Sequence, residues 1–231
     1  ANTGVTMIAN GGAVATLTGS STADTFTIGK TTAVTHVVEA GTGTDTVNLT
    51  LTTGTTVMTG LNDAEIYNIT VDSSAVAVVT TAGAGKFFND TVVETVNLTG
   101  GSSDSTFDSG TDGVDSSSTM TLFDATGFKG RINDLLFDAD QLGSTVTVKG
   151  GEHAKDVVSA TFANDSLVRM SAVETLGTTF TGTKSVDVAN VTGMTAITVA
   201  SDTSARVGTI SQLGAGVTIS LTTDDANDGL T

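Results

Sequence analysis

The chain has 231 residues, carries a net charge of −16 at neutral pH and contains no cysteine. This length can bury a substantial hydrophobic core, in one elongated domain or two smaller ones, without disulfide cross-links. Only nine Lys and Arg stand against 25 Asp and Glu, which excludes nucleic acid as a partner, because phosphate binding needs clustered cations.

Apolar and polar residues alternate in short runs along the whole chain. Alternation places every second side chain on the buried face of a strand. Gly, Asn, Asp and Ser separate the runs and mark turns. The predicted strands are, in chain order, residues 25–28, 46–51, 66–71, 95–98, 145–148, 195–199 and 217–221. This rhythm predicts an all-β sandwich, barrel or solenoid.

Residues 131–142 are the one stretch with a partly helical apolar spacing. Asp138 and Asp140 fit a helix poorly there, and a bent strand explains the pattern equally well. The chain contains no proline, although proline commonly protects sheet edges. Stacked coils would limit the number of exposed edges, which favours the solenoid.

Several turns combine glycine with a carboxylate just before a predicted strand. Glycine carbonyls and carboxylates are the ligands that Ca²⁺ prefers, so we expect calcium sites at these turns. The alternative is a turn Asp that accepts hydrogen bonds from backbone N–H groups and needs no metal. The candidate ligands are Glu39, Gly41, Gly43 and Asp45 in one turn, Asp24 after Gly19 in a second, and Gly150, Glu152 and Asp156, with Gly151, in a third.

Two further groups of acidic residues are open to two interpretations. Four carboxylates lie in a Gly- and Ser-rich stretch and bind metal or form a solvated loop: Asp104, Asp108, Asp112 and Asp115. Three glutamates, Glu65, Glu94 and Glu174, each precede an alternating strand. They would ligate ions between coils or point outward, and we favour the outward orientation.

A weak internal repeat relates the two parts of the chain. The spacing from Asp45 to Asp156 is nearly the spacing from Glu65 to Glu174. This predicts two β-solenoid-like modules, residues 1–110 and 111–231, or one continuous domain. The chain begins at Ala1 without a signal-peptide pattern, which favours a piece of a longer protein.

The sequence offers no support for catalysis. It contains no His/Cys metal spacing, nucleophile elbow or phosphate loop, so we expect no enzyme activity. His36 lies in a strand-like context and His153 in a polar turn. No run approaches the roughly 18 apolar residues of a membrane-spanning helix. The asparagines of the Asn-x-Thr/Ser triplets are expected to stack as side-chain ladders between coils rather than to carry glycans; they are Asn48, Asn68, Asn89, Asn97, Asn164 and Asn190.

Five short phrases in order resemble the RTX-related surface-layer (S-layer) proteins of bacteria. The phrases are Leu17-Thr-Gly-Ser-Ser-Thr-Ala-Asp-Thr-Phe26, Glu39-Ala-Gly-Thr-Gly-Thr-Asp-Thr-Val47, Val93-Glu-Thr-Val-Asn97, Phe123-Asp-Ala-Thr-Gly127 and Val146-Thr-Val-Lys-Gly-Gly151. They span most of the chain. The resemblance implies an all-β fold of parallel β-solenoid or β-helix-like modules with calcium-binding turns.

The same resemblance implies export by a type I secretion system and calcium-dependent self-assembly into a two-dimensional lattice at the cell surface. Cell-surface lipopolysaccharide or another glycan is the expected anchoring partner. The chain departs from the family in having no tandem array of complete glycine-rich nonapeptides, so isolated ions between coils are expected. The alternative function is a calcium-stabilised module of a large secreted adhesin. Ice binding by Thr rows and a carbohydrate-acting β-helix enzyme are less favoured.

Overall fold

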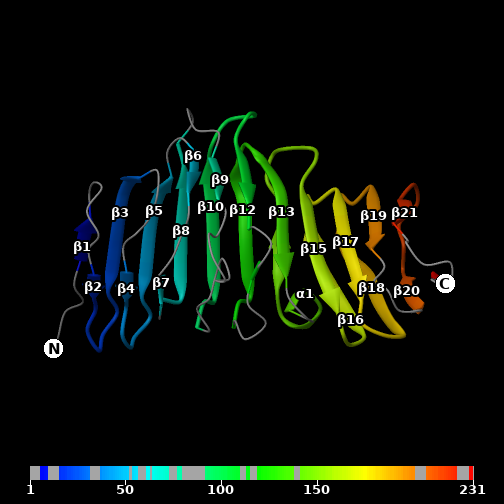
Figure 1. Cartoon of the computed structure of the whole chain (residues 1–231), viewed down its shortest axis with the longest axis horizontal. Coiled ribbons are helices and arrows are strands. Elements are labelled where there is room, and N and C mark those ends of the chain that lie inside the picture. The colour runs from blue at the N-terminus through cyan, green and yellow to red at the C-terminus, as the bar shows by residue number, and fades with distance from the viewer. Residues whose placement is uncertain are drawn as a thin grey trace.

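The chain folds into a parallel β-solenoid with almost no helix (Figure 1). The computed structural model describes residues 6–9, 16–31, 37–51, 54–56, 61–62, 64–72, 77–79, 92–109, 113–114, 119–137, 141–200, 207–222 and 229–230. The coils follow one another along the long axis, and β1 and β21 lie at its opposite ends. No helix in these ranges is long and apolar enough to cross a membrane.

One wall of the solenoid is an eleven-stranded parallel sheet that runs the length of the molecule. Its strands, in spatial order, are β1 (Thr6–Ala9), β3 (Thr25–Thr31), β5 (Thr46–Leu51), β8 (Ile66–Val71), β10 (Thr95–Gly100), β12 (Leu122–Phe128), β14 (Thr147–Lys149), β16 (Ser166–Ser171), β18 (Lys184–Thr192), β20 (Val207–Ser211) and β22 (Gly229–Leu230).

The remaining strands form three smaller parallel sheets. The six-stranded sheet contains β11 (Thr106–Asp108), β13 (Arg131–Phe137), β15 (Val157–Phe162), β17 (Thr175–Phe180), β19 (Ala196–Ala200) and β21 (Thr218–Thr222). The three-stranded sheet contains β2 (Thr16–Thr18), β4 (Val37–Glu39) and β7 (Leu61–Asn62), and β6 (Gly54–Thr56) pairs with β9 (Ala77–Val79). A single turn of helix, α1 (Gln141–Ser144), precedes β14.

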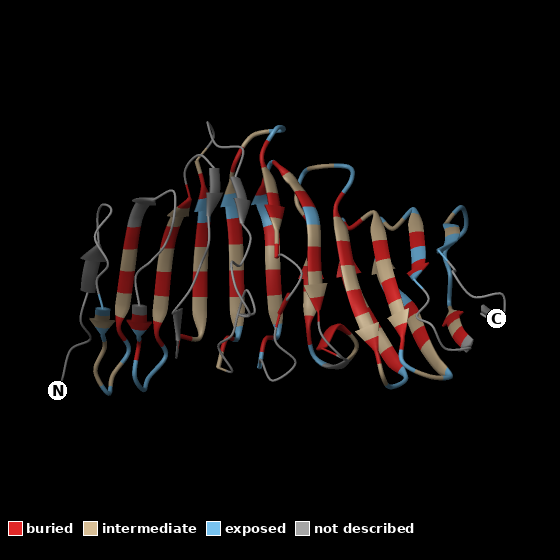
Figure 2. Ribbon diagram, in the orientation of Figure 1, coloured by how far each residue is buried: buried red, intermediate tan, exposed pale blue. Residues whose placement is uncertain are grey.

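The core is built from columns of apolar side chains at equivalent positions of successive strands. Strand register aligns Phe26 with Val47, Tyr67, Val96, Phe123 and Val148, and all of these residues are buried. Figure 2 shows the resulting alternation of buried and partly exposed residues along each strand. Burying one such side chain contributes about 2 kcal/mol, so the stacked columns hold the coils together.

The outward positions of three neighbouring strands carry an asparagine ladder, Asn48, Asn68 and Asn97. The Asn68 Nδ2 donates to Asn48 Oδ1 at 2.9 Å, and the Asn97 Nδ2 donates to Asn68 Oδ1 at 2.8 Å. The predicted stacking of these three side chains between coils is therefore confirmed. On the next strand Asp124 follows in register with Asn97 and pairs with Lys149 at 2.7 Å.

The predicted fold class and most predicted strands are confirmed. β5 and β8 have the expected bounds, and β19 and β21 begin one residue later than expected. The ambiguous stretch 131–142 divides into strand β13 and the start of helix α1, with Asp138 and Asp140 outside the described residues. β10 pairs with β12 across residue 110, so the large sheet is continuous there; the division into two modules stays a prediction.

Candidate functional site

The predicted glycine turns stack tightly on the backbone of the neighbouring coil. A Cβ on Gly19 would lie 1.9 Å from the carbonyl oxygen of Ala40, and one on Gly150 would lie 1.7 Å from that of Ala172. Gly41 and Gly43 have φ of +97° and +142°, a region that disfavours other residues. Glycine is thus required at these turns by packing and by backbone conformation.

Two of the predicted aspartates close their own turns. The Asp24 side chain is only 2% exposed, and its Oδ2 accepts a hydrogen bond from the backbone N–H of Ser20. Asp156 is fully buried, and its Oδ2 accepts from the backbone N–H of Gly151 at 2.8 Å. Each carboxylate therefore folds back over the turn that precedes it, as the metal-free alternative predicted.

Hydrogen bonds also join Asp24, Asp45 and Glu65 of successive coils. We call these three residues the first carboxylate ladder. The backbone N–H of Asp24 donates to Asp45 Oδ1 at 2.6 Å, and the N–H of Asp45 donates to Glu65 Oε2 at 2.6 Å. These residues immediately precede β3, β5 and β8. Asp45 and Glu65 thus each accept the N–H of the acid that precedes the strand of the previous coil.

A second carboxylate ladder, Asp156 and Glu174, repeats the arrangement on the six-stranded sheet. The N–H of Ile132 donates to Asp156 Oδ1 at 2.8 Å, and the N–H of Asp156 donates to Glu174 Oε2 at 2.8 Å. A backbone N–H that is buried without a partner costs stability. The carboxylates satisfy these groups at the junctions between turn and strand.

Burial raises the pKa of Asp156 above its ordinary value. The hydrogen bonds from the N–H groups of Ile132 and Gly151 oppose this rise, the charge of Glu174 adds to it, and His153 lowers the pKa. The ladder therefore holds two carboxylates close enough to repel each other in a partly dehydrated place. Such a site gains stability from a proton or a cation.

Other predicted ligands lie in different surroundings. Glu39, Gly41 and Gly43 are exposed, whereas Asp45 of the same candidate site is fully buried. Glu152 is exposed and Gly150 is buried beside Asp156. Within the described ranges no three His, Asp or Glu side chains converge in the way a metal site built from side chains alone would require. Calcium binding at these turns stays a prediction.

The remaining acidic candidates are separated by the fold. Asp104 is exposed in a turn, and Asp108 on β11 is half-buried and accepts a hydrogen bond from Asn133 Nδ2 at 2.7 Å. Asp112 and Asp115 lie outside the described residues, as does His36. Among the glutamates, Glu94 is exposed as expected, while Glu65 and Glu174 instead reach back to backbone N–H groups.

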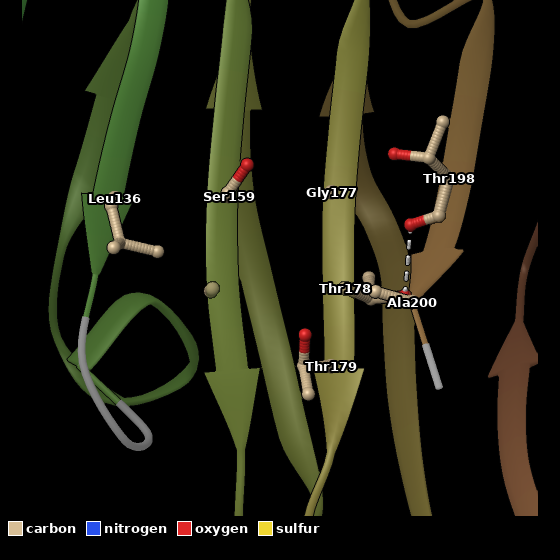
Figure 3. A pocket seen from close by; sticks show the side chains of 8 residues that line it. Leu136, Ser159, Gly177, Thr178, Thr179, Thr198 and Ala200 are labelled. Atoms are coloured by element: carbon tan, nitrogen blue, oxygen red, sulfur yellow. Dashed lines mark hydrogen bonds between the residues drawn. The ribbon is translucent and has the colours of Figure 1, made fainter. Parts of the chain in front are cut away.

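A second polar region, not foreseen from the sequence, lies on the outer face of the six-stranded sheet. Asp134 is in register with Asp108, and burial raises the pKa of Asp134, with Ser159 lowering it and the charge of Asp108 raising it further. A shallow hollow of about 140 Å³ lies nearby, where Gly177 provides no side chain between Ser159 and Thr198 (Figure 3). Spacing along one strand could not reveal this group, because its members come from five strands, β11, β13, β15, β17 and β19.

Comparison of the chain with protein-family models, with curated proteins and with solved structures finds no match.

Proposed function

We propose that this chain is a structural constituent of a bacterial surface layer, which assembles with copies of itself into a two-dimensional lattice in the presence of Ca²⁺. The observation that carries the proposal is the pair of stacked, partly dehydrated carboxylates at the coil junctions. A chain with a net charge of −16 places its acids where they repel one another, and a divalent cation is the simplest way to relieve that repulsion.

The residues at the second carboxylate ladder have the chemistry that a calcium ion needs. Carboxylate oxygens each carry two lone pairs, and one backbone N–H engages each oxygen of Asp156. Asp156 and Glu174 would supply hard oxygen ligands, with carbonyl groups of the Gly150 turn completing the shell. The bound ion would neutralise the charge that Glu174 imposes on Asp156.

The first carboxylate ladder offers the same donor set on the other sheet. Asp45 and Glu65 lie in successive coils, and the glycine turn at Gly41 and Gly43 is exposed to solvent. Cations at both ladders would stiffen the solenoid at two edges. A rigid rod with long repetitive sheets is a suitable building block for a lattice, because each coil presents the same outward spacing of about 4.8 Å.

Electron microscopy of the purified chain tests this function directly. We expect ordered sheets with calcium and their dispersal by the chelator EGTA. The double variant D156N/E174Q should assemble poorly even with calcium. The control E94Q changes an exposed glutamate that precedes a strand in the same way, and it should assemble like the wild type. Sheets that persist in EGTA would contradict the role of calcium, and a stable monomer that binds a glycan array would favour the adhesin alternative.

A further inference from the structure

Two carboxylates face each other across neighbouring strands of the six-stranded sheet. Strand register places Asp108 of β11 opposite Asp134 of β13, and adjacent strands lie about 4.8 Å apart. The register shifts just before this pair, because β13 has one extra residue there, Asn133. Like charges directly opposite each other on adjacent strands destabilise a sheet. The pair therefore weakens the sheet whenever both carboxylates are ionised.

The Asp134 carboxylate has few hydrogen-bond donors for a charged group. Its Oδ1 is buried and accepts no hydrogen bond, and the hydroxyl of Ser159 bonds to the same carboxylate. Asp108 differs, because its Oδ2 accepts a 2.7 Å hydrogen bond from Asn133 Nδ2. A buried carboxylate oxygen without a donor costs more free energy when the group is charged than when it is neutral. The surroundings of Asp134 therefore favour the protonated acid.

The charged groups around Asp134 do not neutralise the pair. β11 contributes Asp108, while β15 and the packed segment 113–114 contain no titratable residue. On β13 itself the only cation is Arg131, whose Nε donates to a backbone carbonyl oxygen of the next turn at 3.0 Å. Burial raises the pKa of Asp134, the hydrogen bond with Ser159 lowers it, and the charge of Asp108 raises it further, with a net rise above its ordinary value.

The same residues hold β11 on β13. The N–H of Ser109 donates to the carbonyl oxygen of Asp134 at 2.9 Å, and the N–H of Leu136 donates to Ser109 Oγ at 2.8 Å. Ser109 is fully buried. β11 has three residues and is, within the described part of the chain, the first strand of its sheet. Repulsion between the two acids therefore acts at the contact that joins a short strand to the rest of the sheet.

We propose that Asp108 and Asp134 hold one proton between them in the folded chain, and that this proton makes the junction of β11 and β13 sensitive to pH. Solvent supplies the proton, Asp134 binds it, and Asp108 keeps its charge and accepts the resulting O–H. Loss of the proton leaves two facing charges, so the junction opens more often. The inference goes beyond the proposed function, because it needs neither calcium nor assembly.

Hydrogen exchange of the Ser109 and Leu136 amides in EGTA measures the opening of this junction. Because Asp134 binds its proton more tightly in the folded state, its contribution to stability is fully present below pH 3.8 and is lost as pH rises through the raised pKa. A pKa raised by one corresponds to a change of about tenfold in the opening equilibrium. We expect the protection of both amides, corrected for the intrinsic exchange rate, to fall by about that factor or more from acid to neutral buffer.

Two substitutions at the pair test its role. Asp134→Asn provides a neutral group with the shape of the protonated acid. It should keep both amides protected in neutral buffer and raise the midpoint of thermal unfolding there above that of the wild type. Asp108→Asn removes the facing charge and should weaken the dependence on pH. The control Asp104→Asn changes an exposed acid of the preceding turn and should behave like the wild type.

A folded Asp134→Asn variant that is less stable than the wild type in neutral buffer overturns the inference, and so does wild-type protection that does not change with pH. If circular dichroism shows that the variant does not fold, NMR of the wild-type Asp134 carboxyl carbon decides. Titration at or below the ordinary pKa of 3.8 overturns the inference, and titration above it supports the inference. Protection that depends on pH in a chain without calcium-dependent sheets would remove the proposed function alone. Calcium-dependent sheets from a chain whose protection ignores pH would do the reverse.

Discussion

The N-terminal and C-terminal coils solve one structural problem with the same chemistry on different walls. In the N-terminal coils, Asp45 and Glu65 close the strand starts of the eleven-stranded sheet. In the C-terminal coils, Asp156 and Glu174 do so on the six-stranded sheet. A buried backbone N–H at the junction between turn and strand requires a hydrogen-bond acceptor. This requirement is the same in both sheets, and a carboxylate of the next coil meets it in each.

Both ladders end in the same way. The backbone N–H of Glu94 donates to the carbonyl oxygen of Glu65 rather than to a carboxylate, and Glu94 is exposed. Beyond Glu94 and Glu174, the next coils supply Thr121 and Thr195, whose hydroxyls donate to the carbonyl oxygens of those two glutamates. The comparison predicts that acids of similar sequence context differ sharply in their contribution to stability.

The largest loss of stability is expected from a substitution in the Gly150 turn, which packs against the backbone of Ala172 in the next coil. Gly150→Ala would place a Cβ at 1.7 Å from the Ala172 carbonyl, so the turn must move and the free energy of unfolding should fall by about 3 kcal/mol or more. Gly214→Ala is the control, since the nearest atom to its Cβ would be 4.0 Å away. Urea unfolding measures both. Equal stabilities for the two variants would show that the stacked turns are not as tight as described.

Removing one carboxylate oxygen should have the next largest effect. Asp156→Asn presents an NH₂ group to one of the two backbone N–H donors at Gly151 and Ile132, so one hydrogen bond is lost and two donors face each other. We expect a loss of about 1–3 kcal/mol in calcium-free buffer. Glu94→Gln should change little. If the glutamate variant is the more damaging, the distinction between ladder and exposed acids is wrong.

The N-terminal and C-terminal coils also differ in the outward side chains of their strands. The N-terminal coils carry the asparagine ladder, whereas the six-stranded sheet of the C-terminal coils carries an outward row of Ser159, Gly177 and Thr198. Asn68→Ala removes both amide hydrogen bonds of the central rung and should cost about 1–2 kcal/mol. Asn190→Ala, at an exposed position of β18, is the control. Thermal unfolding of the two variants compares them, and equal midpoints would show that the ladder adds no stability.

The smallest expected effect is a change in pH dependence. The folded-state pKa of Asp156 lies above its ordinary value, so the folded state binds this proton more tightly than the unfolded state does. Its contribution to stability is therefore highest below pH 3.8 and falls as pH rises through the raised pKa. Glu174→Gln should weaken this slope in calcium-free buffer. The free energy of unfolding of both proteins is measured from below pH 3.8 to above the raised pKa of Asp156. An equal dependence on pH in Glu174→Gln and in the wild type would contradict the pairing of the two acids.

The pKa of Asp124 is shifted in the opposite direction to that of Asp156, so its contribution to stability depends on pH in the opposite way. Burial raises its pKa, but the hydrogen bonds from Lys149 and Thr126 and the charge of Lys149 together hold the pKa below its ordinary value. Stability from this group is present above pH 3.8 and is lost as pH falls through the lowered pKa.

Local patterns were sufficient to predict seven of the strands and part of the asparagine ladder, but not strands such as β15 to β18. Thr46–Leu51 and Ile66–Val71 alternate over six residues between turn residues, so period and boundaries agree and both strands were predicted to the residue. Stacking was predicted for the asparagines of all six Asn-x-Thr/Ser triplets, and the hydrogen bonds among Asn48, Asn68 and Asn97 confirm it for these three. Residues 131–142 were ambiguous because a strand and a helical turn follow each other there.

The partners of the acids could not be predicted, because each lies in another coil. Asp45 was correctly expected in a turn just before a strand, yet its hydrogen bond from the N–H of Asp24 depends on how consecutive coils stack. Glu65 and Glu174 were expected to point outward for the same reason. The group formed by Asp134, Ser159 and the hollow at Gly177 also depends on register between strands, which no single segment encodes.

The central claim is that carboxylates stacked at the coil junctions make this solenoid responsive to Ca²⁺. The most direct test is to titrate calcium into the wild type and into the D156N/E174Q variant while following the midpoint of thermal unfolding. The account predicts a midpoint that rises with calcium for the wild type and rises clearly less for the variant. Equal rises in the two proteins, or none in the wild type, would contradict it.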